Sequence, residues 1–121
     1  RRLKLVALAQ EGFVMISEQA YPGAARWVLH ACAAAGFRPR ILQAAERGHT
    51  ILSLVAAGAG VALLPESLRQ LPHPGVVFLP LDDAPAMPLH LAWNPTSINP
   101  TRDAFLASCA SRPVEDPDPQ L

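Results

Sequence analysis

The stretch from Thr50 to Pro65, TILSLVAAGAGVALLP, constrains the fold of this chain more than any other part of it. It combines a short amphipathic segment, an Ala-Gly-Ala-Gly turn and a four-residue apolar run that a proline ends. Small residues allow the backbones of a helix and a strand to approach each other closely. We therefore expect a helix over residues 49–57 and a buried strand over residues 61–64, joined as one unit of a tightly wound sheet.

The sequence before this stretch predicts two further strands with a helix between them. The apolar run 12–17 suits a buried strand of a parallel or mixed sheet. Residues 24–35 repeat apolar side chains at helical spacing, among them Val28 and Ala31, while residues 40–44 read as a second strand. Strands that alternate with helices indicate an α/β sheet with helices on its faces.

The sequence after residue 65 predicts, in order, a short helix over residues 66–71, strands over 76–79 and 89–93, and a helix over 99–110. Asn99 is suited to cap the last helix and Pro100 to occupy its first turn. The tail 113–121, rich in Asp and Pro, is expected to be disordered.

Composition narrows the classes of function. Lys and Arg together equal Asp and Glu at 10 each, so the chain lacks the basic excess of a domain that grips DNA phosphates. Cys32 and Cys109 have no metal-like spacing, and two buried thiols are expected. No apolar run reaches the ~20 residues of a membrane span, and the start lacks a signal peptide's core. We expect a cytoplasmic protein without a membrane partner, metal or cofactor.

One edge of the expected sheet could bind a ligand, because open α/β sheets bind ligands beyond the carboxyl ends of their strands. Residues 17–23 follow the first strand there, and residues 46–50 lead into the next helix. Exposed N–H groups and the positive end of a helix dipole favour an anion such as a carboxylate. Side chains that could add hydrogen bonds or a ring are Ser17, Tyr21, His49 and Thr50. Plain N-capping and loop solvation stay open as the alternative for each residue.

The sequence gives little support for a catalytic site. His49 and Glu46 could form an acid–base pair, but they are only three residues apart across a loop, and no nucleophile motif of the G-x-S-x-G kind occurs. Gly58-Ala59-Gly60 follows a helix and precedes a strand, the reverse of what a dinucleotide fingerprint requires. No catalytic residue is therefore assigned, and an enzyme that uses His49 and Glu46 is the least favoured interpretation.

The order of these elements resembles the effector-sensing domain of LysR-type transcriptional regulators. The resemblance rests on the helix, the glycine turn, VALLPESL from Val61 and PGVVFLPL from Pro74, and it covers roughly residues 8–110. It implies an α/β fold of the periplasmic-binding-protein-like (type 2) kind, in which a mostly parallel sheet is flanked by helices. In this family a small-molecule effector binds between two lobes.

The resemblance also implies a division of the chain. Residues 1–11 would approach the hinge, 12–88 would form the second lobe, 89–112 would return as a strand and a helix to a remnant of the first lobe, and 113–121 would be the tail. By position, the effector-binding residues would be Ser17, Tyr21, Pro22, Gly23, Ala24, His49 and Thr50. Trp93 and Asn94 would lie at the hinge, and Trp93 suits a core better than a ligand platform.

The function that follows from the resemblance is sensing of a small-molecule effector in transcription control, with no enzymatic activity. The chain would be N-terminally truncated, so that DNA contact depends on a missing winged helix-turn-helix domain, and a homo-oligomer is expected. The alternative is a solute-binding module of the same fold that has no DNA-binding partner.

Overall fold

The computed structural model describes residues 1–87 and 90–110, and the chain divides into two compact units, Arg1–Met87 and Pro88–Leu121. We call them the sheet unit and the α3 unit. The α3 unit contains the helix α3 (Pro100–Ala110). The sheet unit contains, with η for a 3-10 helix, η1 (Leu5–Leu8), β1 (Gly12–Ile16), α1 (Ala24–Ala34), β2 (Arg40–Ala45), α2 (Gly48–Ala56) and η2 (Glu66–Gln70).

The sheet unit is built on the parallel pair β1 and β2. Gly12 pairs with Arg40 at one end, and Ile16 pairs with Ala45 at the other. Both strands, α1, α2, η2 and α3 lie within a residue or two of their predicted bounds, although η2, after Pro65, is of the 3-10 kind. The short helix η1 was not predicted. The prediction of an α/β arrangement with parallel strands is therefore confirmed for β1, β2 and the helices that follow them.

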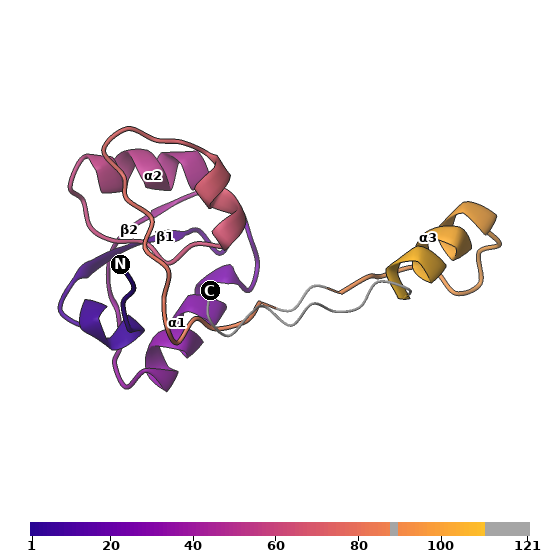
Figure 1. The fold of residues 1–121 in the computed structure, drawn as a ribbon, viewed down its shortest axis with the longest axis horizontal. Coiled ribbons are helices and arrows are strands. Elements are labelled where there is room, and N and C mark those ends of the chain that lie inside the picture. The colour runs from indigo at the N-terminus through magenta and orange to yellow at the C-terminus, as the bar shows by residue number, and fades with distance from the viewer. Residues whose placement is uncertain (88–89, 111–121) are drawn as a thin grey trace. The chain divides into compact units, whose positions relative to one another are not determined.

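Alternate side chains of β1 enter two hydrophobic clusters. Phe13 and Met15 lie in a cluster with Val28 of α1, whereas Val14 lies in another with Ile51 of α2. Successive side chains of a strand point to opposite faces of its sheet, so the two helices cover opposite faces. Figure 1 shows α1 and α2 on either side of the strands, as predicted.

The turn before Val61 brings the chain against β1. Val14 N–H donates to the Val61 carbonyl at 2.8 Å, and Val61 N–H donates to the Gly12 carbonyl at 2.8 Å. Gly60 has φ +151°, and a Cβ atom there would overlap the Gly12 carbonyl oxygen. The predicted close approach through small residues is therefore confirmed at Gly60.

The predicted strand over residues 61–64 is reduced to a single parallel bridge between Phe13 and Val61. Its alternation is nevertheless present, because Val61 and Leu63 pack against the α1 cluster while Ala62 and Leu64 pack against the α2 cluster. The side chains are placed as in a strand, but the backbone ladder to β1 does not continue beyond Val61.

The predicted strands over 76–79 and 89–93 are wrong for the residues that the structure describes. The bridge nearest to residues 76–79 joins Leu81 to Leu3, with Asp82 N–H donating to the Leu3 carbonyl at 2.8 Å. Residues 90–93 also form no strand. An extended segment becomes a strand only where a neighbour supplies a ladder. Leu89 and the predicted disordered tail 113–121 lie outside the described residues.

The two cysteines differ in burial. Cys32 is 0% exposed, as predicted, and burial raises the pKa of its thiol. Cys109 is exposed, so the prediction of two buried thiols is wrong. No residue of α3 is buried, so the apolar side chains of that helix are not packed in a core formed by the described residues of the α3 unit.

Candidate functional site

The carboxyl ends of β1 and β2 place the two predicted ligand-binding segments beside each other. Ser17 follows β1 directly, and its N–H donates to the carbonyl of Ala45, the last residue of β2, at 2.8 Å. Residues 17–23 therefore leave the sheet next to residues 46 and 47. The shared edge that the sequence predicted is present in the structure.

The loop from Ser17 to Gly23 is held by its own hydrogen bonds. The Ser17 hydroxyl accepts from the Ala20 N–H at 3.2 Å, and the Glu18 carboxylate accepts from the Gly23 N–H at 2.7 Å. Because the hydroxyl of Ser17 acts as an acceptor there, its single hydrogen is left for donation to a further acceptor. Local turn formation and ligand binding by Ser17 are thus compatible.

Two helices begin at this edge. α1 starts after Gly23, at φ +90°, and α2 starts after Arg47; neither cap residue makes a side-chain capping hydrogen bond. The first bond of α2 runs from Ile51 N–H to the Arg47 carbonyl at 3.1 Å, so the N–H groups of the preceding first turn have no helical partner. Such groups, with the helix dipole, favour an anion.

The predicted side chains at this edge are mostly accessible. Tyr21 is 63% exposed, and Pro22, Gly23, His49 and Thr50 are also exposed, while Ser17 and Ala24 are half-buried. Hydrogen bonds of the loop join Ser17 to Tyr21 and Tyr21 to Ala24, both at 3.1 Å between backbone atoms. No described hydrogen bond joins this loop to His49 or Thr50, whose segment is linked to it through Ala45.

Neither an acid–base pair nor a metal cluster is formed in the described part of the chain. Glu46 and His49 make no ion pair there, and no group of three His, Cys, Asp or Glu residues among these residues could hold a metal ion. Among the same residues, no helix has the length and apolar character needed to cross a bilayer.

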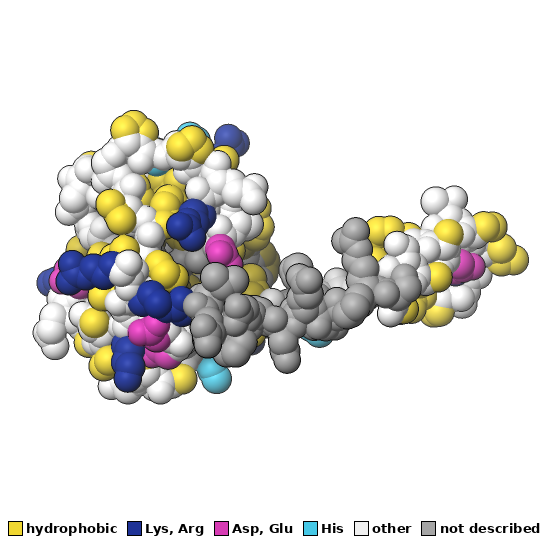
Figure 2. Space-filling model, viewed as in Figure 1, with side chains coloured by type: hydrophobic (Ala, Val, Ile, Leu, Met, Phe, Trp, Pro, Cys, Tyr) yellow, Lys and Arg dark blue, Asp and Glu magenta, His cyan; other side chains and the backbone are white. Residues whose placement is uncertain are grey.

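Charge is mixed on the surface of the sheet unit. On the face drawn in Figure 2, Lys and Arg side chains lie among Asp and Glu side chains rather than in a separate basic patch. Arg2 and Asp82 form one such ion pair.

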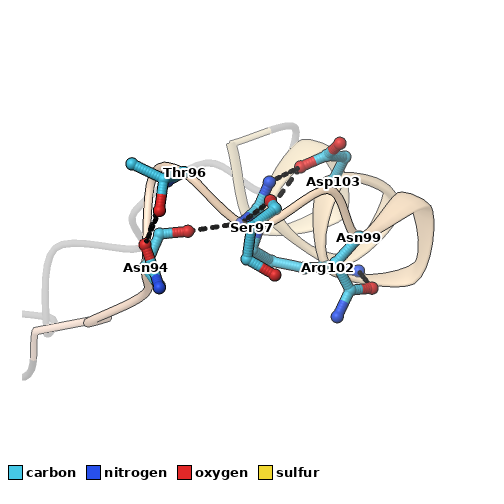
Figure 3. A network of polar contacts seen from close by, with 6 residues as sticks. All are labelled: Asn94, Thr96, Ser97, Asn99, Arg102 and Asp103. Atoms are coloured by element: carbon cyan, nitrogen blue, oxygen red, sulfur yellow. Dashed lines mark hydrogen bonds and ion pairs between the residues drawn. The ribbon is translucent and has the colours of Figure 1, made fainter.

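Asn94, one of the predicted hinge residues, takes part in a hydrogen-bonded network of the α3 unit (Figure 3). Its side-chain oxygen accepts from the N–H of Thr96 at 3.0 Å and from the hydroxyl of Thr96 at 2.7 Å. Trp93, which was expected to suit a core, is 52% exposed and is not part of this network.

Arg102 holds this network together, and sequence reasoning missed it. Its guanidinium donates to the carbonyls of Asn94 and Ser97 at 2.8 and 2.9 Å and pairs with the Asp103 carboxylate. The Asn99 side chain accepts from the Arg102 N–H at 3.0 Å, so the predicted helix cap is confirmed. The sequence did contain a signal for this role, because Arg102 follows two residues after the Asn99-Pro100 start of the helix.

A hollow of about 340 Å³ lies beside α1, and it overlaps the predicted site only at Gly23. Another hollow is lined by Glu66, Ser67, Arg69 and Gln70 of η2, none of which is a predicted site residue. The predicted effector site is therefore an open edge of the sheet unit, and a second wall would have to come from elsewhere to enclose a ligand there.

Comparisons with known proteins agree with the resemblance. The family described as the LysR substrate binding domain matches residues 1–113. The HTH-type transcriptional regulator IlvR of Caulobacter vibrioides is 38% identical over 104 residues, which are 86% of this chain and 35% of that protein. The regulator ShiR of Corynebacterium glutamicum is 37% identical over 103 residues, 84% of this chain and 35% of that protein.

A third relative extends the same pattern. The HTH-type transcriptional regulator TtuA of Agrobacterium vitis is 32% identical over 110 residues, which are 87% of this chain and 36% of that protein. The chain spans about a third of the length of these relatives. The family is one of transcriptional regulators rather than enzymes, and its fold is of the periplasmic-binding-protein-like α/β kind. Because the match covers most of its length, this chain belongs to the LysR substrate binding domain family.

Proposed function

We propose that the chain is the small-molecule sensing part of a LysR-type transcriptional regulator. The observation that carries this proposal is the match of residues 1–113 to the family's substrate binding domain. DNA would be contacted by a helix-turn-helix segment outside these 121 residues, and the protein would act in the cytoplasm without catalysing a reaction. The relatives named above are all transcriptional regulators, which favours this function over a solute-binding module without a DNA-binding partner.

The sheet edge is the part of the chain that we assign to the effector. The adjacent strand ends, the open first turn of α2 and the nearby start of α1 support binding of a carboxylate, since backbone N–H groups and the helix dipole both favour negative charge. Within the lobe division implied by the family, residues 12–88 form one wall of the cleft, and Trp93 and Asn94 lie at the hinge.

Removing a hydroxyl from this edge should weaken effector binding. We expect Ser17→Ala and Thr50→Val each to raise the dissociation constant about tenfold, because a hydrogen bond to a charged group contributes about 1.5–3 kcal/mol. A panel of small carboxylates, screened by thermal shift, would supply the ligand, and calorimetry would measure both variants.

Ser67→Ala is the matched control for this experiment, since Ser67 lies on η2 outside the predicted site. Its affinity should equal that of the unmodified chain, and all three variants should unfold within about 1 kcal/mol of it. Equal affinities for Ser17→Ala, Thr50→Val and Ser67→Ala would remove both hydroxyls from the effector site.

The exposed apolar side chains of the α3 unit support the further proposal that this chain self-associates. Phe105 is 57% exposed and Ile98 is 95% exposed, and contacts between copies would remove such surface from water. We expect light scattering to show a mass that rises with concentration, and Phe105→Ser to reduce that rise. A strictly monomeric mass at high concentration would contradict the proposal.

A further inference from the structure

Residues 66–76, which we call the strap, lie along α2 from its start to its end. At the start of α2, a Cβ atom on Gly48 would lie 3.1 Å from Cδ1 of Leu68. At its end, a Cβ atom on Gly75 would lie 3.5 Å from the Cβ atom of Ala56. The strap therefore follows the helix in the same direction and covers part of its outer face.

Between these two contacts, the side chains of Ser53 and His73 join the strap to α2. The Ser53 hydroxyl oxygen lies 3.1 Å from Nε2 of His73, and the hydroxyl also donates to the His49 carbonyl at 3.1 Å. The second ring nitrogen, Nδ1, donates to the Pro74 carbonyl at 2.9 Å. In the neutral ring Nε2 is then an acceptor, so the hydroxyl hydrogen is shared between Nε2 and the His49 carbonyl. We call this arrangement the latch.

The latch reaches the first turn of α2, which carries two of the predicted effector residues, His49 and Thr50. This turn begins without a side-chain cap on Arg47, and uncapped helix ends open at little cost in free energy. Among the described residues, the latch supplies the only hydrogen bond between the strap and α2. The half-buried position of His73 limits the competition from water for this bond.

We propose that Ser53 and His73 are positioning residues, which keep the first turn of α2 closed and so hold His49 and Thr50 in place for the effector. The effect on the effector rests on the sensing function proposed above, whereas the ordering of the turn does not. Without the latch the turn opens more often, and a ligand of this edge meets a smaller binding-competent population.

Amide hydrogen exchange, followed by NMR on the whole chain, measures the ordering. The N–H of Ile51 closes the first turn by donating to the Arg47 carbonyl, and Ser53→Ala should speed its exchange about fivefold, as expected for the loss of one hydrogen bond. The global free energy of unfolding should be unchanged or higher, because alanine favours an exposed helix position more than serine does. Local opening without global loss distinguishes the latch from general packing.

Further variants show whether the two side chains act together. His73→Ala should also speed the exchange of Ile51, and the double variant should exchange no faster than Ser53→Ala alone, because both changes remove the same contact. Ser53→Thr keeps a hydroxyl that can bond the carbonyl one turn earlier, and it should restore slow exchange. The matched controls are Ser67→Ala, on the strap outside the latch, and His30→Ala, on α1. Neither should change the exchange of Ile51.

Benzoate serves as the carboxylate probe for the effector edge, and its binding is followed by the chemical shift of the Thr50 amide. Because the end of the helix is open for an appreciable fraction of the time, a fivefold rise in that opening should raise the apparent dissociation constant about twofold. Ser53→Ala and His73→Ala should both show this rise. Ser53→Thr and the two controls should bind benzoate as the unmodified chain does.

Each part of the proposal can be overturned separately. Equal exchange of Ile51 in Ser53→Ala and Ser67→Ala would show that the latch does not order the turn. Faster exchange with unchanged benzoate affinity would show that the latch does not act on the effector edge. A Thr50 amide that benzoate leaves unmoved in the unmodified chain would count against the effector edge itself, and the exchange of Ile51 would still decide whether the latch exists.

Discussion

Replacing Phe13 with alanine should lower the free energy of unfolding by about 3–5 kcal/mol, the usual cost of removing a fully buried phenylalanine side chain. Phe13, the second residue of β1, is 0% exposed and lies in the cluster with Leu5, Val28 and Cys32. Its ring also packs against Phe37, with centroids 6.2 Å apart. The loss includes both the transfer of the ring from water and the cavity that remains.

Urea denaturation followed by circular dichroism measures this change. Small domains are stable by only about 5–15 kcal/mol, so Phe13→Ala should bring the chain close to unfolding and is best measured in the cold. Phe13→Leu, which keeps most of the volume, should cost less. Val77→Ala, at a side chain that is 80% exposed, should change stability by less than about 0.5 kcal/mol. Equal effects of Phe13→Ala and Val77→Ala would contradict the assigned core.

Replacing Gly60 with alanine should lower the free energy of unfolding by more than about 2 kcal/mol. A side chain at φ +151° carries backbone strain of about 1–3 kcal/mol. The new Cβ would also overlap the Gly12 carbonyl oxygen and lie 3.0 Å from its carbon, so the chain would have to move away from β1. That movement would weaken the two hydrogen bonds between Val61 and β1, each contributing about 1 kcal/mol.

Gly58→Ala is the matched control for the effect of close approach. Gly58 lies two residues earlier in the same turn, at φ +80°, and a Cβ atom there would meet nothing within 4 Å. It should cost about 1 kcal/mol, from backbone conformation alone. Thermal and urea unfolding of both variants would measure the difference. Equal losses would show that packing of Gly60 against Gly12 does not contribute.

The sequence allowed us to predict where the candidate site lies in the fold, but not which hydrogen bonds its residues make. That Ser17 and Thr50 follow neighbouring strands could be inferred, because parallel strands end at the same edge. The acceptor role of the Ser17 hydroxyl and the link from Ser17 to Ala45 depend on loop geometry that no periodic pattern records. The hollow beside α1 could not be predicted either, because its second side is the Pro85–Ala86 segment, which lies 59 residues further along the chain from Trp27.

The sequence by itself determined the local elements of this protein. Helical spacing, the Asn99 cap and the glycine turn before Val61 are local signals, and helices form their hydrogen bonds within one segment. Only the tertiary structure decided which extended segments became strands. β1 and β2 pair with each other, whereas residues 76–79 form no ladder with a described neighbour. A strand needs a second strand to complete its hydrogen bonds, and that second strand can lie far away in the sequence.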